Sequence, residues 1–341
     1  MRIALYGGSF DPVHFAHLKV AKTALKKHLA KEVWFIPTYQ NPWKETSGAT
    51  FKQRVSMLQA AIAPYRHMKV CQIESIWSDA SYTIRTVEEL MKRYPQHEFI
   101  YLIGTDQAKS LHKWKAIDQL MDKISFYVFT RSDEAVNSPF PLHFVKMNRL
   151  VMSSSEIKNG RISAIPKAVR VEIGKNGCYF EHWVKQYMSE KRFLHSLSVA
   201  NLAKEIAIAN HLDEKKAWLC GLLHDVCKEL PYQEEKKWME IYHPEHLLQA
   251  PAIWHGYLGA HFVEQHFMVR DAEILSAIYH HVLGNGVGPY DMVLYVSDKL
   301  DPLRPYDSSK TIALCKKDLL KGFQQVKQEQ QEYLKKEQVI A

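Results

Sequence analysis

The sequence lacks the features of disulfide-bonded, membrane-spanning and repetitive proteins. Its 341 residues include five scattered cysteines and no CxxC pair: Cys71, Cys178, Cys220, Cys227 and Cys315. Such a set argues against a disulfide framework and against a thiolate zinc site. No apolar run approaches the roughly 18 residues of a membrane span, and neither a signal-peptide layout nor an internal repeat is present. We therefore expect a cytoplasmic protein with reduced thiols and no membrane partner.

Charge is unevenly distributed along the chain. The net charge of +8 divides into +10 for residues 1–183 and −2 for residues 184–341. A length of 341 residues predicts about two domains, and this shift places the boundary between them. The basic first part suits phosphate-bearing ligands. Long basic runs and aromatic-basic platforms are absent, so nucleic acid is not expected as a partner.

The hydrophobic pattern predicts two different folds. Up to about residue 130, short apolar runs such as Ile3–Tyr6 and Phe99–Gly104 alternate with helical patterns such as Phe51–Ala63. This alternation predicts an α/β domain with a doubly wound, Rossmann-like parallel sheet over residues 1–183. Ligands of such sheets bind beyond the carboxyl ends of the strands. Residues 184–341 carry apolar residues at helical spacing and predict an all-α domain.

A glycine turn follows the first predicted strand and leads into a helix. Gly7, Gly8, Ser9 and Phe10 precede His14 and His17. Glycines let backbone amides approach an anion, and the start of a helix adds unpaired N–H groups and the positive end of its dipole. The two histidines are three residues apart, so they share a helix face and both can donate to a phosphate. The turn therefore predicts a nucleotide-phosphate site.

The segment 7–17 resembles the HxGH signature of the nucleotidyltransferase superfamily, with Ala16 where glycine is usual. Further matches resemble the bacterial nicotinate-nucleotide adenylyltransferases and together cover about 180 residues. They are Asn41-Pro42-Trp43-Lys44, Arg54, Tyr82-Thr83, Leu102 to Gln107 with Trp114, and Met152 to Lys158. The resemblance implies adenylyl transfer from ATP, accompanied by Mg²⁺, to nicotinate mononucleotide.

The same resemblance implies roles for individual residues. His14 and His17 would hold the ATP phosphates, and Lys44 would neutralise phosphate charge. Substrate or ATP contacts are implied for Gly7, Gly8, Ser9, Phe10, Arg54, Tyr82, Thr83, Gly104, Asp106, Trp114, Ser153, Ser154 and Lys158. Lys158 stands where an arginine is usual, and a lysine offers only a point charge in place of a bidentate fork. Arg161 is a candidate to compensate.

The second part of the chain is rich in histidine. It holds ten of the eighteen histidines, and several of these lie inside apolar helical patterns, where an unpaired imidazole is costly. His195, His224-Asp225, His255, His280-His281 and Asp298 fall on successive predicted helices. Imidazole and carboxylate ligands together suit iron, manganese or zinc. We expect a metal site here, and we expect His211, His243, His246, His261 and His266 to lie outside it.

These motifs resemble the HD-domain phosphohydrolases, in particular the branch that hydrolyses diadenosine tetraphosphate symmetrically to ADP. The resemblance covers roughly 150 residues and implies His195, His224, Asp225 and Asp298 as ligands of iron, with manganese as the alternative. Asp225 would also be catalytic. Contacts to a dinucleoside polyphosphate are implied for Arg192, Lys228, His255, His280, His281 and Arg304.

Alternative functions stay open at this stage. The first domain could serve another acceptor, such as nicotinamide mononucleotide or phosphopantetheine. The helical domain could bind a nucleotide without hydrolysing it and so regulate the first, although a binding module has no need of four metal ligands. A synthetase-like RNA binder would require an RNA-binding appendage that the sequence lacks. The sequence allows a homo-oligomer and does not decide it.

Overall fold

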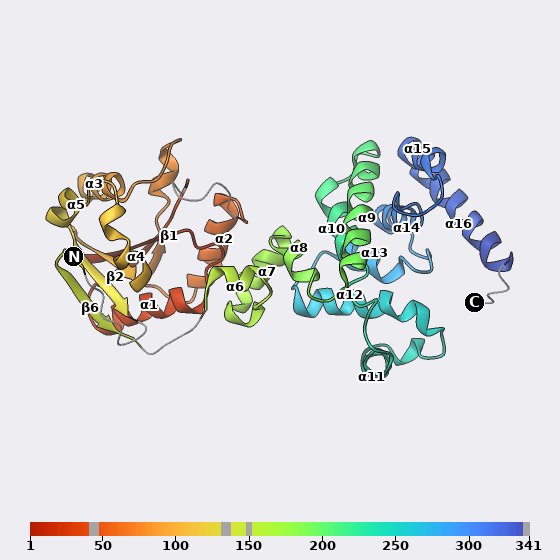
Figure 1. Cartoon of the computed structure of the whole chain (residues 1–341), viewed down its shortest axis with the longest axis horizontal. Coiled ribbons are helices and arrows are strands. Elements are labelled where there is room, and N and C mark those ends of the chain that lie inside the picture. The colour runs from red at the N-terminus through yellow and green to blue at the C-terminus, as the bar shows by residue number, and fades with distance from the viewer. Residues whose placement is uncertain (41–47, 131–137, 148–151, 337–341) are drawn as a thin grey trace. The chain divides into compact units, whose positions relative to one another are not determined.

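A computed structural model describes residues 1–40, 48–130, 138–147 and 152–336. The chain forms two compact units, Met1–Cys178 and Tyr179–Ala341. Figure 1 shows the sheet of the first unit and the helices of the second. The expected parallel α/β domain followed by an all-helical domain is confirmed. Within the described residues, no helix is both long enough and apolar enough to cross a membrane.

The first unit is built on a six-stranded sheet of order β3-β2-β1-β4-β5-β6 in which every pairing is parallel. The strands are β1 (Arg2–Gly8), β2 (Glu32–Pro37), β3 (Met68–Val70), β4 (Glu98–Gly104), β5 (Ser125–Thr130) and β6 (Leu142–Lys146). The edge strand β6 was not predicted, because its residues are largely exposed and lack a continuous apolar run. All six strands end at one edge of the sheet, where ligands of this fold bind.

Helices connect the strands and cover the sheet. They are α1 (Phe15–Lys26), α2 (Phe51–Ile62), α3 (Thr83–Arg93), α4 (Thr105–Lys109), α5 (Ile117–Lys123), α6 (Ser154–Lys158) and α7 (Lys167–Asn176). Short 3-10 turns occur at Ile73–Ile76, Leu111–Lys113 and Ile162–Ala164. One core layer joins Ile3 and Leu5 of β1 to Val87 of α3 and Leu120 of α5. Side chains alternate along a strand, so Ala4 and Tyr6 face the opposite layer.

The second unit is helical throughout its described residues. Its helices are α8 (Phe180–Val184), α9 (Glu190–Ala209), α10 (Glu214–Leu223), α11 (Tyr232–Tyr242), α12 (Trp254–His266), α13 (Ala272–His280), α14 (Pro289–Lys299), α15 (Ser309–Lys317) and α16 (Leu319–Lys336). Short 3-10 turns occur at Pro244–His246 and Pro251–Ile253. Phe180 and Trp183 pack against Phe267. Helix α8 therefore belongs to this unit, although the predicted boundary followed residue 183.

Candidate functional site

The segment after β1, which ends in Gly7 and Gly8, leads into α1 with two histidines in contact. The rings of His14 and His17 stack with centroids 3.7 Å apart, and the His14 backbone N–H donates to Nδ1 of His17 at 3.2 Å. Phe10, which was expected to contact ATP, is buried and packs edge-on against the His17 ring at 5.0 Å. The contact with Phe10 thus orients the His17 ring, and through it the stacked pair of imidazoles.

A cavity of about 1080 Å³ opens beside this segment at the carboxyl ends of the strands. Of the residues expected at a substrate site, Gly7, Gly8, Ser9, Tyr82, Thr83, Asp106 and Trp114 line it. A Cβ atom at Gly7 would lie 2.0 Å from the Tyr101 hydroxyl, so only glycine fits there. Gly104 ends β4 and is the N-cap of α4. The cavity has the size and place of a nucleotide site in this fold.

Arg54 was expected to contact substrate but is directed into the protein. Its side chain is 3% exposed, and its guanidinium donates to three backbone carbonyls: Ser9 at 2.7 Å, Thr38 at 2.8 Å and Ala49 at 3.3 Å. These carbonyls belong to the segment after β1, the end of β2 and the approach to α2. Arg54 therefore joins two residues of the cavity wall, Ser9 and Thr38, to the residue before the N-cap of α2.

The buried Glu74, which the sequence did not single out, lines the same cavity. Its carboxylate accepts hydrogen bonds from the Tyr39 backbone N–H at 3.2 Å and from the Thr86 hydroxyl at 3.0 Å. Burial raises the pKa of Glu74, and the Ser81 and Thr86 hydroxyls oppose that rise. Two buried charged side chains thus fix the chain just after β2: Arg54 bonds to Thr38, and Glu74 bonds to the next residue, Tyr39.

The remaining predicted phosphate contacts lie around α6. Ser153 caps this helix by accepting from the Glu156 N–H at 3.2 Å, and the Ser154 hydroxyl donates to the Pro12 carbonyl at 3.2 Å. Lys158 forms an ion pair with the buried Asp11. Arg161 pairs with Glu156 at 3.2 Å. Lys44 lies outside the described residues.

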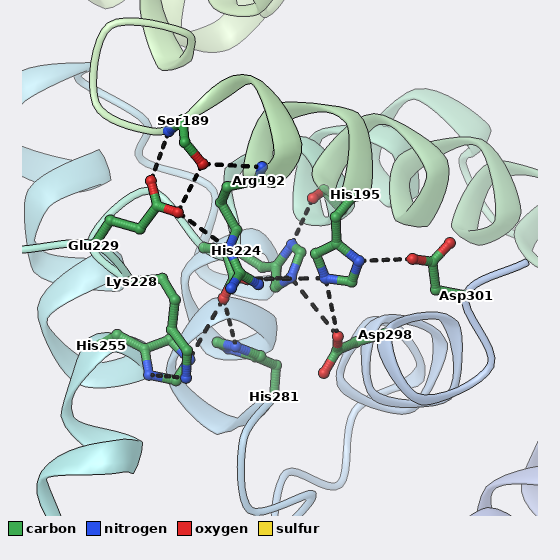
Figure 2. Close-up of polar contacts among 12 residues, drawn as sticks. Ser189, Arg192, His195, His224, Lys228, Glu229, His255, His281, Asp298 and Asp301 are labelled. Atoms are coloured by element: carbon green, nitrogen blue, oxygen red, sulfur yellow. Dashed lines mark hydrogen bonds and ion pairs between the residues drawn. The ribbon is translucent and has the colours of Figure 1, made fainter. Parts of the chain in front are cut away.

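The second unit gathers histidines and aspartates from four helices at one point. His195 lies on α9, His224 follows α10, His281 follows α13 and Asp298 lies on α14 (Figure 2). Asp225 is the residue after His224. His195 Nε2 lies 3.3 Å from Asp298 Oδ1, and His224 Nε2 lies 3.4 Å from Asp225 Oδ2. Two overlapping triplets could each hold a metal ion: His195, His224, Asp298 and His224, Asp225, His281.

The hydrogen bonds of these imidazoles fit a metal site. Nδ1 of His195 bonds to Asp301 Oδ2 at 2.7 Å. Nδ1 of His224 donates to the Gly221 carbonyl at 2.7 Å, and Nδ1 of His281 donates to the Ile278 carbonyl at 2.6 Å. With Nδ1 carrying the proton, each ring presents a free lone pair at Nε2. The fully buried Nε2 of His224 has no hydrogen-bond partner among the described residues, as expected of a ligand atom.

Both aspartates of the cluster favour the carboxylate form, and although burial opposes it, the Asp225 carboxylate raises the pKa of His224. Burial opposes ionisation of Asp225 and Asp298, but neighbouring groups hold the pKa of each carboxyl well below its usual range. For Asp225 the chief of these groups is His224, and for Asp298 it is Lys299. Burial drives the pKa of His255 well below its usual value. A set of two carboxylates and three imidazoles suits a divalent transition metal.

Basic groups surround this centre. A small cavity of about 150 Å³ is lined by Arg192, Lys228, Lys299 and Arg304 together with His255 and His281. Arg192 Nη1 lies 2.7 Å from Asp225 Oδ2, and Arg304 Nη2 lies 3.4 Å from Asp298 Oδ1. Lys228 donates to His255 Nδ1 at 3.2 Å. A polyanion entering the cavity would meet cations on several sides.

The structure separates the adjacent histidines 280 and 281. His281 joins the metal cluster, although we expected it to contact polyphosphate, whereas His280 donates from Nδ1 to the Ser276 carbonyl at 2.9 Å on its own helix. Lys299 and Asp301 were not assigned roles from the sequence. The one available signal was their position one and three residues after Asp298.

Comparisons with known proteins agree with this division. Residues 5–160 match the cytidylyltransferase-like family, and residues 192–303 match the HD domain family. A probable nicotinate-nucleotide adenylyltransferase/Ap4A hydrolase of Mycoplasma genitalium is 35% identical over 89% of this chain and 88% of its own length. Its counterpart in Mycoplasma pneumoniae is 30% identical over 94% and 96%. A probable nicotinate-nucleotide adenylyltransferase of Shouchella clausii is 42% identical over 46% of this chain and 82% of its own length. The chain therefore belongs to the family of fused nicotinate-nucleotide adenylyltransferase/Ap4A hydrolase proteins.

Proposed function

We propose that the first unit transfers the adenylyl group of ATP to nicotinate mononucleotide. An oxygen of the mononucleotide 5′-phosphate bonds to the α-phosphorus of ATP, the bond from that phosphorus to the β-phosphate oxygen breaks, and pyrophosphate leaves. The dinucleotide product is the deamido form of NAD. The names of the relatives and the cavity beside the segment after β1 support this reaction.

The rate of such a transfer depends mainly on how the reactants are positioned and on how phosphate charge is neutralised. The stacked His14 and His17 donate to the ATP phosphates as negative charge builds on the leaving pyrophosphate. Backbone amides of Gly8 and Ser9 approach the same phosphates, and Mg²⁺ accompanies ATP. Tyr82, Thr83 and Trp114 line the cavity and receive the pyridine ring. Lys44, Ser153 and Ser154 complete the proposed phosphate contacts.

The second unit hydrolyses dinucleoside polyphosphates such as Ap4A. His195, His224, Asp225 and Asp298 hold a divalent metal, iron or manganese, with His281 available to a second ion. When bound, the metal acts as a Lewis acid and makes water a better nucleophile near neutral pH. Arg192, Lys228, Lys299 and Arg304 bind the polyphosphate and offset the charge that develops on it. The three imidazole Nε2 atoms that converge on two buried carboxylates carry this proposal. Both reactions take place in the cytoplasm in this proposal. The five free cysteines support this location, because thiols stay reduced there.

Two variants of the full-length protein test both assignments at once. His17→Ala should abolish pyrophosphate release from ATP and nicotinate mononucleotide while ADP release from Ap4A, with Fe²⁺ or Mn²⁺, continues. Asp225→Ala should lose bound metal and Ap4A hydrolysis while adenylyl transfer continues. Each variant is thus the folding control for the other. Joint loss of both activities in a folded variant would contradict two separate sites, and unchanged metal content in Asp225→Ala would reject the ligand set.

A further inference from the structure

We propose that Lys327, on the C-terminal helix α16, is a positioning residue for the metal centre of the second unit. Its side chain holds the loop that begins with His281, and so decides whether this imidazole reaches the metal. The inference rests on the metal-dependent hydrolysis proposed for this unit. Helix α16 lies after residues 192–303, which match the HD domain family, so the family match assigns it no role.

The loop of residues 281–288 joins α13 to α14 and carries one member of the metal cluster. His281 belongs to one of the two triplets that could hold a metal ion, and its Nε2 lies 3.7 Å from Asp225 Oδ1. Val282 lines the small basic cavity. Residues 283–287 then alternate between exposed and buried, so one side of the loop packs against the protein. The position of His281 therefore depends on how this loop is held.

Gly284 contacts α16 from within this loop. Its carbonyl accepts a hydrogen bond from Lys327 Nζ at 2.9 Å, and its N–H donates to the His280 carbonyl at 2.9 Å. Its φ is 59°, in the left-handed region that glycine adopts readily. A Cβ atom here would lie 2.5 Å from the ring of Tyr295, so the loop backbone packs directly on that ring. Lys327 thus fixes the loop three residues after His281.

Tyr295 joins this contact to the rest of the centre. It is buried and lies on α14, one turn before Asp298. Its ring packs edge-on against Phe323 of α16, with the ring centroids 5.4 Å apart. Phe323 lies one turn before Lys327, so both side chains share a face of α16. The loop after His281 and the end of α14 therefore meet the same face of α16.

Loss of the Lys327 ammonium would affect the loop more than the fold. The packing of Phe323 on Tyr295 does not depend on that charge, and the far end of the loop is held separately by the Gly288 N–H, which donates to Asp291 Oδ2 at 2.8 Å. The carbonyl of the buried Gly284 would lose its partner, a state that folded proteins avoid. The loop would then turn this carbonyl toward water and draw the nearby imidazole away from the centre.

The test compares full-length wild type with Lys327→Met, Lys327→Arg and His281→Ala. Lys321→Met is the matched control, because the exposed Lys321 lies on the same helix and pairs with Asp318 at 3.2 Å. One measurement is the Mn²⁺ binding isotherm in competition with a chelator, in which His281→Ala identifies the binding step that uses this imidazole. The other is amide hydrogen exchange of residues 282–288 without added metal.

Lys327→Met should weaken the His281-dependent binding step about tenfold, the factor that one charge-assisted hydrogen bond supplies. Hydrogen exchange of residues 282–288 should rise, while exchange elsewhere in the second unit stays unchanged. Lys327→Arg should keep both values, since a guanidinium can still donate to the Gly284 carbonyl. Lys321→Met should match wild type in both measurements. Excess Mn²⁺ should restore Ap4A hydrolysis in Lys327→Met.

The inference fails if folded Lys327→Met keeps the His281-dependent binding step, or if Lys321→Met loses as much affinity. Faster exchange throughout the second unit in Lys327→Met would also reject it, because that result indicates a general loss of stability. Unchanged Mn²⁺ binding in His281→Ala would reject it as well, since no step would then use the imidazole. If wild type binds Mn²⁺ but leaves Ap4A intact, the proposed hydrolysis fails, while binding and exchange still decide the role of Lys327.

Discussion

Replacing Asp301 should weaken metal binding in the second unit without removing a metal ligand. The Asp301 side chain is 2% exposed and accepts three hydrogen bonds. The donors are His195 Nδ1 at 2.7 Å, the Ser198 hydroxyl at 2.5 Å and the Leu303 backbone N–H at 3.1 Å. The first bond directs the Nε2 lone pair of His195 toward the centre, because the proton stays on Nδ1.

In Asp301→Ala the His195 ring loses the bond that selects its tautomer and orientation. Loss of such an outer partner costs about 10- to 100-fold in metal affinity. The stranded donors of Ser198 and Leu303 add a stability cost of about 1–3 kcal/mol. Asp301→Asn should lose less affinity, since its amide oxygen can still accept from His195 Nδ1. Its NH₂ group cannot accept from the Leu303 N–H, so a stability cost remains.

Mn²⁺ affinity, measured by competition with a chelator on the full-length protein, tests this prediction. Asp307→Ala is the matched control: this exposed carboxylate accepts from the Ser309 backbone N–H and should leave the affinity unchanged. Circular dichroism and urea unfolding establish that each variant is folded. An affinity within twofold of wild type in folded Asp301→Ala would refute the role assigned to the carboxylate.

The first unit yields two further predictions. Gly7→Ala should lower kcat/KM for adenylyl transfer about 100-fold, the scale of a 1 Å misplacement. Adding Tyr101→Phe to the Gly7→Ala variant should restore part of the lost activity. The second change removes the hydroxyl that lies 2.0 Å from the new Cβ atom and leaves a contact with Cζ at 3.1 Å. If the double variant is no more active than Gly7→Ala, the steric explanation is wrong. Burial raises the pKa of Glu74, so the folded state binds its proton more tightly than the unfolded state. Wild type should therefore gain stability relative to Glu74→Gln as pH falls from about 7 towards the unfolded pKa of about 4.3, as measured by urea unfolding; the opposite slope would reject a raised pKa.

Local patterns accounted for the parts of the fold that are encoded within a few residues. The apolar run Ile3–Tyr6 predicted a strand, because strand burial is a property of adjacent residues. The expected turn at Gly7 and Gly8 was wrong, since both glycines pair with β2 as the last residues of β1. The spacing of His14 and His17 predicted that they share one face at the start of α1; their stacking is a finding of the structure. The exposed strand β6 carries no such signal, and its place in the sheet depends on pairing with β5.

The sequence by itself determined which chemical groups are present, in what order, and on which kind of element. Only the tertiary structure decided which of them meet. Asp301 reaches His195 across 106 residues, and Arg54 meets Ser9 across 45, so no local spacing could reveal either contact. His280 and His281 are neighbours in sequence, yet one bonds to its own helix and the other joins the metal cluster. Adjacent residues on a helix point about 100° apart, so the packing of α13 selects one and turns the other away.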